Sequence, residues 1–134
     1  MLFDTELVTY RGLYKIIQTD KLNIPTKDGR RTILSNHMPI MIPIDLGVIE
    51  TNNEGVLSHF AVSEGMLYFK NNHATIVCDV IEDIKSVDVK YYEDRIRDAQ
   101  DKLKLARTDV DIKKANIQLA RATNIVKAAG KNNN

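Results

Sequence analysis

Residues 86–106 read SVDVKYYEDRIRDAQDKLKLA, and this stretch decides the fold of the C-terminal part of the chain. Its apolar residues recur at alternating spacings of three and four, at Val89, Tyr92, Ile96, Ala99, Leu103 and Ala106. This period places them along one face of an amphipathic helix. Asp88 precedes the first apolar position and is well placed to cap the helix.

A second helix of the same kind is predicted directly after the first. Thr108 can cap it, and Asp111 stands where a capping box usually has Glu or Gln. The apolar stripe then resumes at Ile112, Ala115, Leu119, Ala122, Val126 and Ala129. Two helices joined by such a short turn must lie antiparallel, and their alanines allow close approach. Because a two-helix hairpin has almost no core, it must dock on another surface.

The first 85 residues have a different pattern, with short β-prone runs separated by turn signals. The signals fall at residues 11–12, 27–29, 52–55, 64–65 and 71–72. In the run over residues 74–80, Ala74, Ile76, Cys78 and Val80 would share one face. Short strands at a spacing of about ten residues predict a sandwich or a barrel. The three prolines, Pro25, Pro39 and Pro43, are expected at edges or in loops.

Composition and charge limit the function classes. The chain has 134 residues, a net charge of +1 and no apolar run long enough to span a membrane. Its acidic start is unlike a signal peptide, and the single cysteine suits a reducing compartment. Residues 1–85 carry 8 basic and 11 acidic side chains, whereas residues 86–134 carry 11 and 7. A basic hairpin of this kind can be attracted to an acidic surface or can simply be solvated.

The chain lacks the usual signatures of an enzyme. Its histidines, His37, His59 and His73, show no zinc-ligand spacing, and Cys78 lies in an apolar strand pattern. No Gly-rich phosphate loop and no G-x-S-x-G elbow occurs. The absence of Trp argues against a base-stacking surface for nucleic acid. We therefore expect no catalytic residue, no metal site and no nucleic-acid partner.

Several segments in order resemble one known family. They are residues 7–13 (LVTYRGL), 22–29 (LNIPTKDG), 33–39 (ILSNHMP), 46–49 (LGVI) and 60–67 (FAVSEGML). Followed by the helical hairpin, they resemble the epsilon subunit of F-type ATP synthases over nearly the whole chain. The resemblance implies an α+β fold with a β-sandwich over residues 1–85 and an antiparallel two-helix hairpin over residues 86–134.

The resemblance also implies a function without catalysis by this chain. In the family the sandwich attaches to the gamma subunit of the central stalk and rests on the membrane rotor ring. The subunit couples rotation to ATP synthesis or hydrolysis, and its hairpin can extend into the alpha/beta head and inhibit hydrolysis. The chain would then be peripheral, at the cytoplasmic face of the cell membrane, in a complex that transports protons. A hairpin that is marginally stable alone can dock either on the sandwich or on the head, and such a two-state element suits a regulatory role.

Candidate interface residues follow from the same resemblance. His37 is expected near the gamma contact, either as an interface residue or as a polar turn residue. The +4 charge of residues 86–134 predicts that the extended hairpin meets an acidic surface of the head through Lys102, Lys104, Lys113, Lys114 or Arg121.

The loop expected to face the rotor ring departs from the family. An acidic residue is usual where this chain has Arg30, followed by Arg31, and the second glycine is Thr32. Either the ring loops have changed sign to match, or the chain serves a repurposed F-type-like ATPase. Drift on an exposed turn is the third interpretation.

Some bacterial relatives bind ATP through acids and arginines between the folded helices. Glu82, Asp88 and Arg121 match that constellation. The other expected arginines are replaced by Tyr91, Asp98 and Ile125. Phosphate recognition favours several converging cations, so we expect weak ATP binding at most and no other cofactor. Two further functions stay open from the residues alone: an unrelated sandwich adaptor whose hairpin binds a partner helix, and a small-molecule hydrolase.

Overall fold

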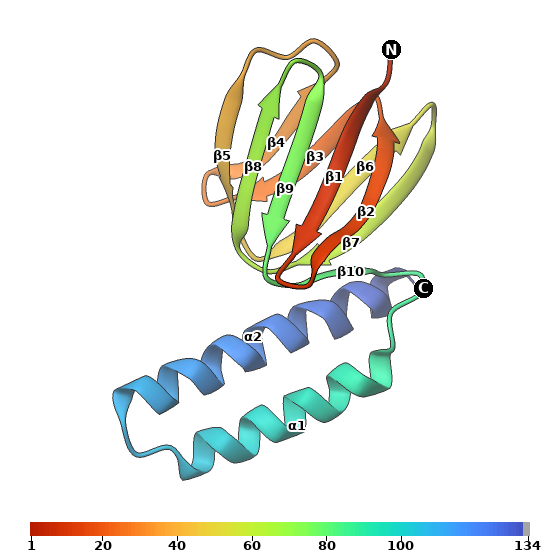
Figure 1. The fold of residues 1–134 in the computed structure, drawn as a ribbon. Coiled ribbons are helices and arrows are strands. Elements are labelled where there is room, and N and C mark those ends of the chain that lie inside the picture. Colours follow the sequence, from red (N-terminus) through yellow and green to blue (C-terminus); the bar gives the residue numbers. More distant parts are fainter. Residues whose placement is uncertain (133–134) are drawn as a thin grey trace. The chain divides into compact units, whose positions relative to one another are not determined.

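The computed structural model describes residues 1–132 and contains ten strands followed by two helices (Figure 1). The chain divides into two compact units, Met1–Asp83 and Ile84–Asn134. Asn133 and Asn134, the last residues of the expected hairpin, lie outside the described residues.

The first unit consists of two five-stranded sheets. The first sheet has the order β2-β1-β9-β8-β5, and the second has the order β10-β7-β6-β3-β4. The strands of the first sheet are β1 (Phe3–Thr9), β2 (Gly12–Thr19), β5 (Ile40–Ile44), β8 (Gly65–Lys70) and β9 (His73–Cys78). The strands of the second sheet are β3 (Lys21–Thr26), β4 (Gly29–Leu34), β6 (Gly47–Asn53), β7 (Val56–Val62) and β10 (Ile81–Asp83).

The two sheets enclose one apolar core. Leu7, Leu22, Ile49 and Ile76 are fully buried, and Phe3 packs edge-on against Phe69 with ring centroids 5.2 Å apart. Along β9 the predicted alternation holds, since Ala74, Ile76 and Cys78 are buried while Val77 is exposed. Because both sheets contribute alternate residues to the core, the unit is a β-sandwich.

The predicted turns join the strands at the expected places. Gly29 has φ 109° and Gly55 has φ 90°, a left-handed region that suits glycine. The prediction that residues 74–80 form one strand is wrong at its end, because β9 stops at Cys78. Val80 is instead held by Ser63, whose backbone N–H donates to the Val80 carbonyl and whose Oγ accepts from the Val80 N–H, both at 3.0 Å.

The expectation for the prolines is correct for two of the three. Pro43 lies on β5, an edge strand, and Pro39 lies in the segment before it. Pro25 instead lies in β3, between β4 and β6. It is tolerated there because the pairing of β3 with β6 covers only Lys21–Asn23 and ends before the proline.

The second unit is an antiparallel pair of helices, α1 (Val89–Leu105) and α2 (Asp109–Asn132), as the apolar stripes predict. Both predicted caps are confirmed. Asp88 accepts a hydrogen bond from the Tyr91 N–H, and Thr108 Oγ1 accepts one from the Asp111 N–H, both at 3.1 Å. The stripe alanines Ala99 and Ala115 are buried. The predicted fold class, a β-sandwich followed by a two-helix hairpin, is therefore confirmed.

Candidate functional site

Arg30 lies on β4 rather than in the expected loop, because the turn is confined to Lys27 and Asp28. Its side chain crosses the outer surface of the second sheet and donates to Asn23 Oδ1. Its Nη2 atom also donates to the Val48 carbonyl at 2.7 Å. The charge of Arg30 is therefore held by groups of the sandwich itself.

Arg31 belongs to the opposite face of β4. The register pairs Arg31 with Ile24, and Ile33, two residues further on, is fully buried. Since successive side chains of a strand point to opposite faces, Arg31 lies on the inter-sheet side of this edge strand and Arg30 on the outer side. The Arg31 side chain is exposed and makes no hydrogen bond or ion pair with any side chain or backbone group that the structure describes. The two arginines therefore do not form one basic patch.

His37 lies in the segment between β4 and β5. Polar contacts hold this segment in place. Asn36, at φ 65°, donates its N–H to Asn72 Oδ1 at 2.6 Å, and the Asn72 side chain donates back at 2.9 Å. His37 is half-buried, its Nδ1 lies 2.7 Å from the Met38 carbonyl, and its ring lies edge-on to Phe69. The neighbouring Met38 is strongly exposed, so this segment presents an ordered polar and apolar surface.

The residues expected to contact ATP are distributed over the two units. Glu82 lies in β10 and pairs with Ala61 of β7 in the sandwich unit. Asp88 and Arg121 belong to the helical unit, where Asp88 is occupied as the N-cap of α1. Asp98, which replaces an arginine, lies 3.2 Å from Lys102 Nζ and 3.6 Å from Arg95 Nη1.

The four hairpin lysines gather near the turn between the helices. Lys102 and Lys104 occupy the last turn of α1, where their charge complements the helix dipole. Lys113 and Lys114 lie near the start of α2 and are exposed. Leu105, 79% exposed, and Val110, 61% exposed, flank the same turn. The end of the hairpin is therefore basic with exposed apolar side chains.

Polar contacts at Asp98 link the two helices. Gln118 of α2 donates to Asp98 Oδ2 and to the Arg95 carbonyl of α1, both at 3.4 Å. The hydrogen bond from Lys102 and then that from Gln118 lower the pKa of Asp98 below its ordinary value. Gln118 carries no signal in the sequence for this contact, because only the pairing of the two helices brings it close to Asp98. Arg97 pairs with Asp94 on the same helix.

The remaining candidate groups lie apart from one another. His59 Nε2 is 2.9 Å from Glu50 Oε2, and His73 lies between Asp4 and Glu6 at 3.9 and 3.4 Å. Cys78 is buried in the sandwich. Within residues 1–132, no group of His, Cys, Asp and Glu is arranged to hold a metal ion. None of the helices described is long and apolar enough to cross a membrane.

Comparison with known proteins identifies the family. The model of the ATP synthase delta/epsilon chain beta-sandwich domain matches residues 3–84. The ATP synthase epsilon chain of Lactobacillus delbrueckii subsp. bulgaricus is 31% identical, covering 96% of this chain and 93% of that protein. This chain belongs to the ATP synthase epsilon chain family. The epsilon chain of Lactobacillus helveticus is 28% identical over 92% of this chain and 89% of its own length.

Two solved structures of similar fold match this chain over both its sandwich unit and its helical unit. A chain of the Euglena gracilis mitochondrial ATP synthase matches 95% of this chain and 81% of its own length, with a TM-score of 0.73. A chain of the Tetrahymena thermophila mitochondrial ATP synthase matches 94% and 95%, with a TM-score of 0.60. Both are 15% identical in sequence, and they agree with this chain in fold.

Proposed function

We propose that this chain is a non-catalytic subunit of the central stalk of an F-type ATP synthase, where it couples rotation to ATP synthesis or hydrolysis. Membership of the epsilon chain family, with similarity over both the sandwich and the hairpin, carries this proposal. The solved structure of similar fold from Tetrahymena is described as a central stalk and c-ring. In this role the chain is peripheral, at the cytoplasmic face of the membrane, and contributes to proton transport through its complex.

The sandwich is the part that we expect to hold the chain to the gamma subunit and to the rotor ring. It has its own core, enclosed by two sheets, and can present a rigid surface without the helices. The ordered segment around His37, with the exposed Met38, is the proposed contact with gamma. Arg31 is the proposed contact with the ring, since its charge is not neutralised within residues 1–132.

The hairpin is the proposed regulatory part. Lys104, Lys113 and Lys114 are exposed around its turn, beside the exposed Leu105. An acidic surface of the alpha/beta head would be attracted to these lysines and would desolvate the leucine. Bound in this way, the hairpin would oppose rotation and inhibit ATP hydrolysis. Glu82, Asp88 and Arg121 would give weak ATP binding at most, because Asp98 repels a triphosphate.

A second candidate is a subunit of a repurposed F-type-like ATPase. The observation that favours it is Arg31, a basic side chain near the position where the family usually carries an acid. A ring with acidic loops would complement Arg31, and a partner other than a ring would point to the repurposed machine.

Co-purification tests the proposed function. An affinity-tagged full chain should bring down alpha, beta and gamma subunits, and a variant limited to residues 1–85 should bring down the same set. Mass spectrometry of the captured proteins would show whether a rotor-ring subunit is present. A folded full chain that captures none of these subunits would contradict the proposal. Capture by the full chain but not by the folded sandwich would move the attachment to the hairpin.

A further inference from the structure

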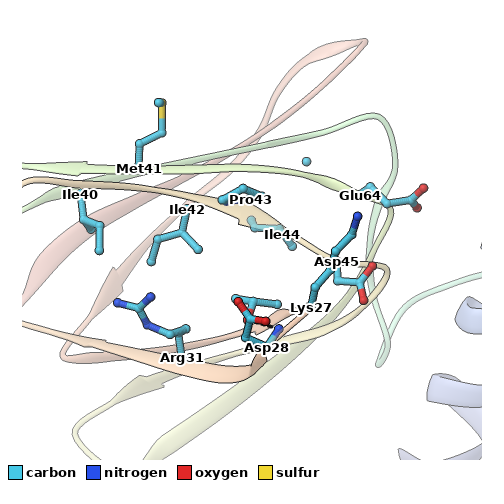
Figure 2. Close-up of a pocket in the computed structure, with 12 residues that line it drawn as sticks. Lys27, Asp28, Arg31, Ile40, Met41, Ile42, Pro43, Ile44, Asp45 and Glu64 are labelled. Atoms are coloured by element: carbon cyan, nitrogen blue, oxygen red, sulfur yellow. Dashed lines mark hydrogen bonds between the residues drawn. The ribbon is translucent and has the colours of Figure 1, made fainter.

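The sandwich has two open sides, where edge strands of the two sheets face each other. On one side β5 lies near β4, and a pocket of about 490 Å³ opens between β5 and the turn that joins β3 to β4 (Figure 2). On the other side β2 faces β10, the last strand before the helical unit. Two consecutive side chains of β2 cross this second opening and contact Asp83 of β10.

The strand β10 is the shortest of the sandwich. It spans three residues, Ile81–Asp83, and it pairs with β7 at the edge of its sheet. The free side of an edge strand leaves backbone N–H groups without a neighbouring strand. Short segments with few ladder hydrogen bonds open locally at a low cost in free energy. Since the boundary between the two units falls directly after Asp83, β10 is also the point where the sandwich ends.

Tyr14 and Lys15 provide contacts on the free side of β10. The Asp83 N–H donates to the Tyr14 hydroxyl oxygen at 3.2 Å, and Lys15 Nζ lies 3.6 Å from Asp83 Oδ2. The same ammonium lies 5.8 Å from the ring centroid of Phe60, the fully buried residue that pairs with Asp83 across β7 and β10. The Asp83 side chain is 18% exposed, so its attraction to Lys15 is only partly screened by water.

A β-bulge explains how two neighbouring side chains reach one residue. In a regular strand, consecutive side chains point to opposite faces. The register of β1 with β2 shifts here, because Leu7 pairs with Lys15 and Val8 pairs with Leu13, which leaves Tyr14 as an extra residue. Leu7 is fully buried, so its partner Lys15 points to the inter-sheet side. The bulge redirects Tyr14, and both side chains therefore meet β10.

We propose that Tyr14 and Lys15 clamp Asp83 and thereby fix the hinge of the helical unit at Ile84. With this clamp in place, the connection from the sandwich to α1 consists of residues 84–88. When the clamp is released, β10 can leave β7, and the connection grows to residues 81–88. A longer connection widens the range of positions that the hairpin can reach. The regulatory use of the hinge rests on the proposed function, whereas the clamp belongs to the isolated chain and can be tested there.

Residue-resolved hydrogen exchange of the full chain tests the clamp, because the exchange rate of a protected amide reports local opening. In the unmodified chain, exchange should be slow at Glu82 and Asp83 and fast at residues 85–86, which places the hinge after β10. Tyr14→Phe removes the acceptor, and Lys15→Met removes the cation but keeps an apolar stem. Each variant should speed exchange of the β10 amides about two- to fivefold, as expected for a lost hydrogen bond or a partly exposed ion pair.

Matched variants separate the clamp from a general loss of stability. Exchange at Leu7 and Ile76, in inner strands of the other sheet, should stay unchanged in Tyr14→Phe and Lys15→Met. Lys15→Arg keeps the cation and should retain slow exchange in β10. Tyr68→Phe and Lys70→Gln, at exposed positions of β8, should have no effect on β10.

A double-mutant cycle then measures the ion pair itself. The variant that combines Lys15→Met with Asp83→Asn should exchange no faster in β10 than the faster of the two single variants, because both remove the same interaction.

Three results would overturn the proposal. One is unchanged exchange of the β10 amides in both Tyr14→Phe and Lys15→Met. The second is an equal increase at Leu7 and Ile76, which would show global destabilisation in place of a local clamp. The third is an equal loss of protection in Lys15→Arg and Lys15→Met, which would exclude the cation as the holding group. Failure to capture ATP synthase subunits would contradict the proposed function alone and would not alter these exchange rates.

Discussion

The guanidinium of Arg30 donates a 2.7 Å hydrogen bond to the backbone carbonyl of Val48, across the strand that carries Pro25. The register of β3 with β6 pairs Asn23 with Glu50, so its continuation would place Pro25 opposite Val48. A proline has no N–H to donate to that carbonyl. Arg30 of β4, which lies opposite Pro25 of β3, supplies the donor in its place.

This relationship predicts that the two neighbouring arginines differ in their effect on stability. Arg30→Ala should lower the free energy of unfolding by about 1 kcal/mol, since it removes the donor of Val48. Arg31→Ala, the matched control, should change it by less than about 0.5 kcal/mol, as exposed substitutions usually do. Urea denaturation of both variants measures the difference. Equal effects would mean that the Arg30 contact adds no stability.

Gly65 should not tolerate a side chain. A Cβ atom there would lie 2.0 Å from the Val77 carbonyl oxygen and 2.6 Å from Cys78 Sγ. Gly65→Ala should therefore destabilise the sandwich by at least about 1–3 kcal/mol, the usual cost of overpacking. Gly130→Ala, at a helical position with open space, should stabilise α2 by up to about 0.5–1 kcal/mol. Thermal unfolding of both variants measures these effects. An unchanged melting temperature of Gly65→Ala would contradict the close contact of position 65 with Val77 and Cys78.

The hairpin lysines should matter for ATP hydrolysis by the complex. Replacing Lys104, Lys113 and Lys114 by glutamine should raise hydrolysis if the hairpin binds an acidic surface. Rising salt should have the same effect on the unmodified complex, because exposed charges are screened over about 8–10 Å at ordinary ionic strength. Lys21→Gln and Lys70→Gln, exposed on the sandwich, serve as controls. If the hydrolysis rate is unchanged in the triple variant and at all salt concentrations, the three lysines do not contribute to inhibition.

Asp98 should make the helical unit sensitive to acid. Its hydrogen bonds from Lys102 and Gln118 lower its pKa in the folded chain below the ordinary value of an aspartate. A carboxyl with a lowered folded pKa stabilises the fold above its unfolded pKa, and this contribution is lost as the pH falls through the folded value. Circular dichroism between pH 5 and pH 2 should show less acid sensitivity in Asp98→Asn. Asp101→Asn is the control on the same helix, and equal profiles for both variants would contradict the prediction.

ATP should bind weakly to the isolated chain. Of the arginines expected in an ATP-binding relative, this chain keeps Arg121. Asp98 brings a negative charge to another of these positions. Isothermal titration with ATP should show little heat at micromolar concentrations, and Asp98→Arg should strengthen the binding. A micromolar affinity of the unmodified chain would refute this prediction.

Much of the fold could be predicted because its signals are local. The change from short strands to a helical period at residue 86 lies in the order of apolar residues, and it predicts two units. Asp88 and Thr108 cap their helices through contacts with residues three positions later. Such contacts depend on neighbouring residues alone, so the sequence by itself determined them.

The sequence did not show which face of a strand or helix each candidate residue occupies, or which distant residue it contacts, because both depend on tertiary structure. Glycine at position 29 predicted a turn, but pairing with β3 draws Arg30 and Arg31 into a strand and separates their side chains. The position of Pro25 in an inner strand depends on where the ladder with β6 ends. Val48 and Gln118 reach their partners only when strands and helices distant in the chain pair. A register between distant segments is set by the packing of a whole core, which no short stretch of sequence contains.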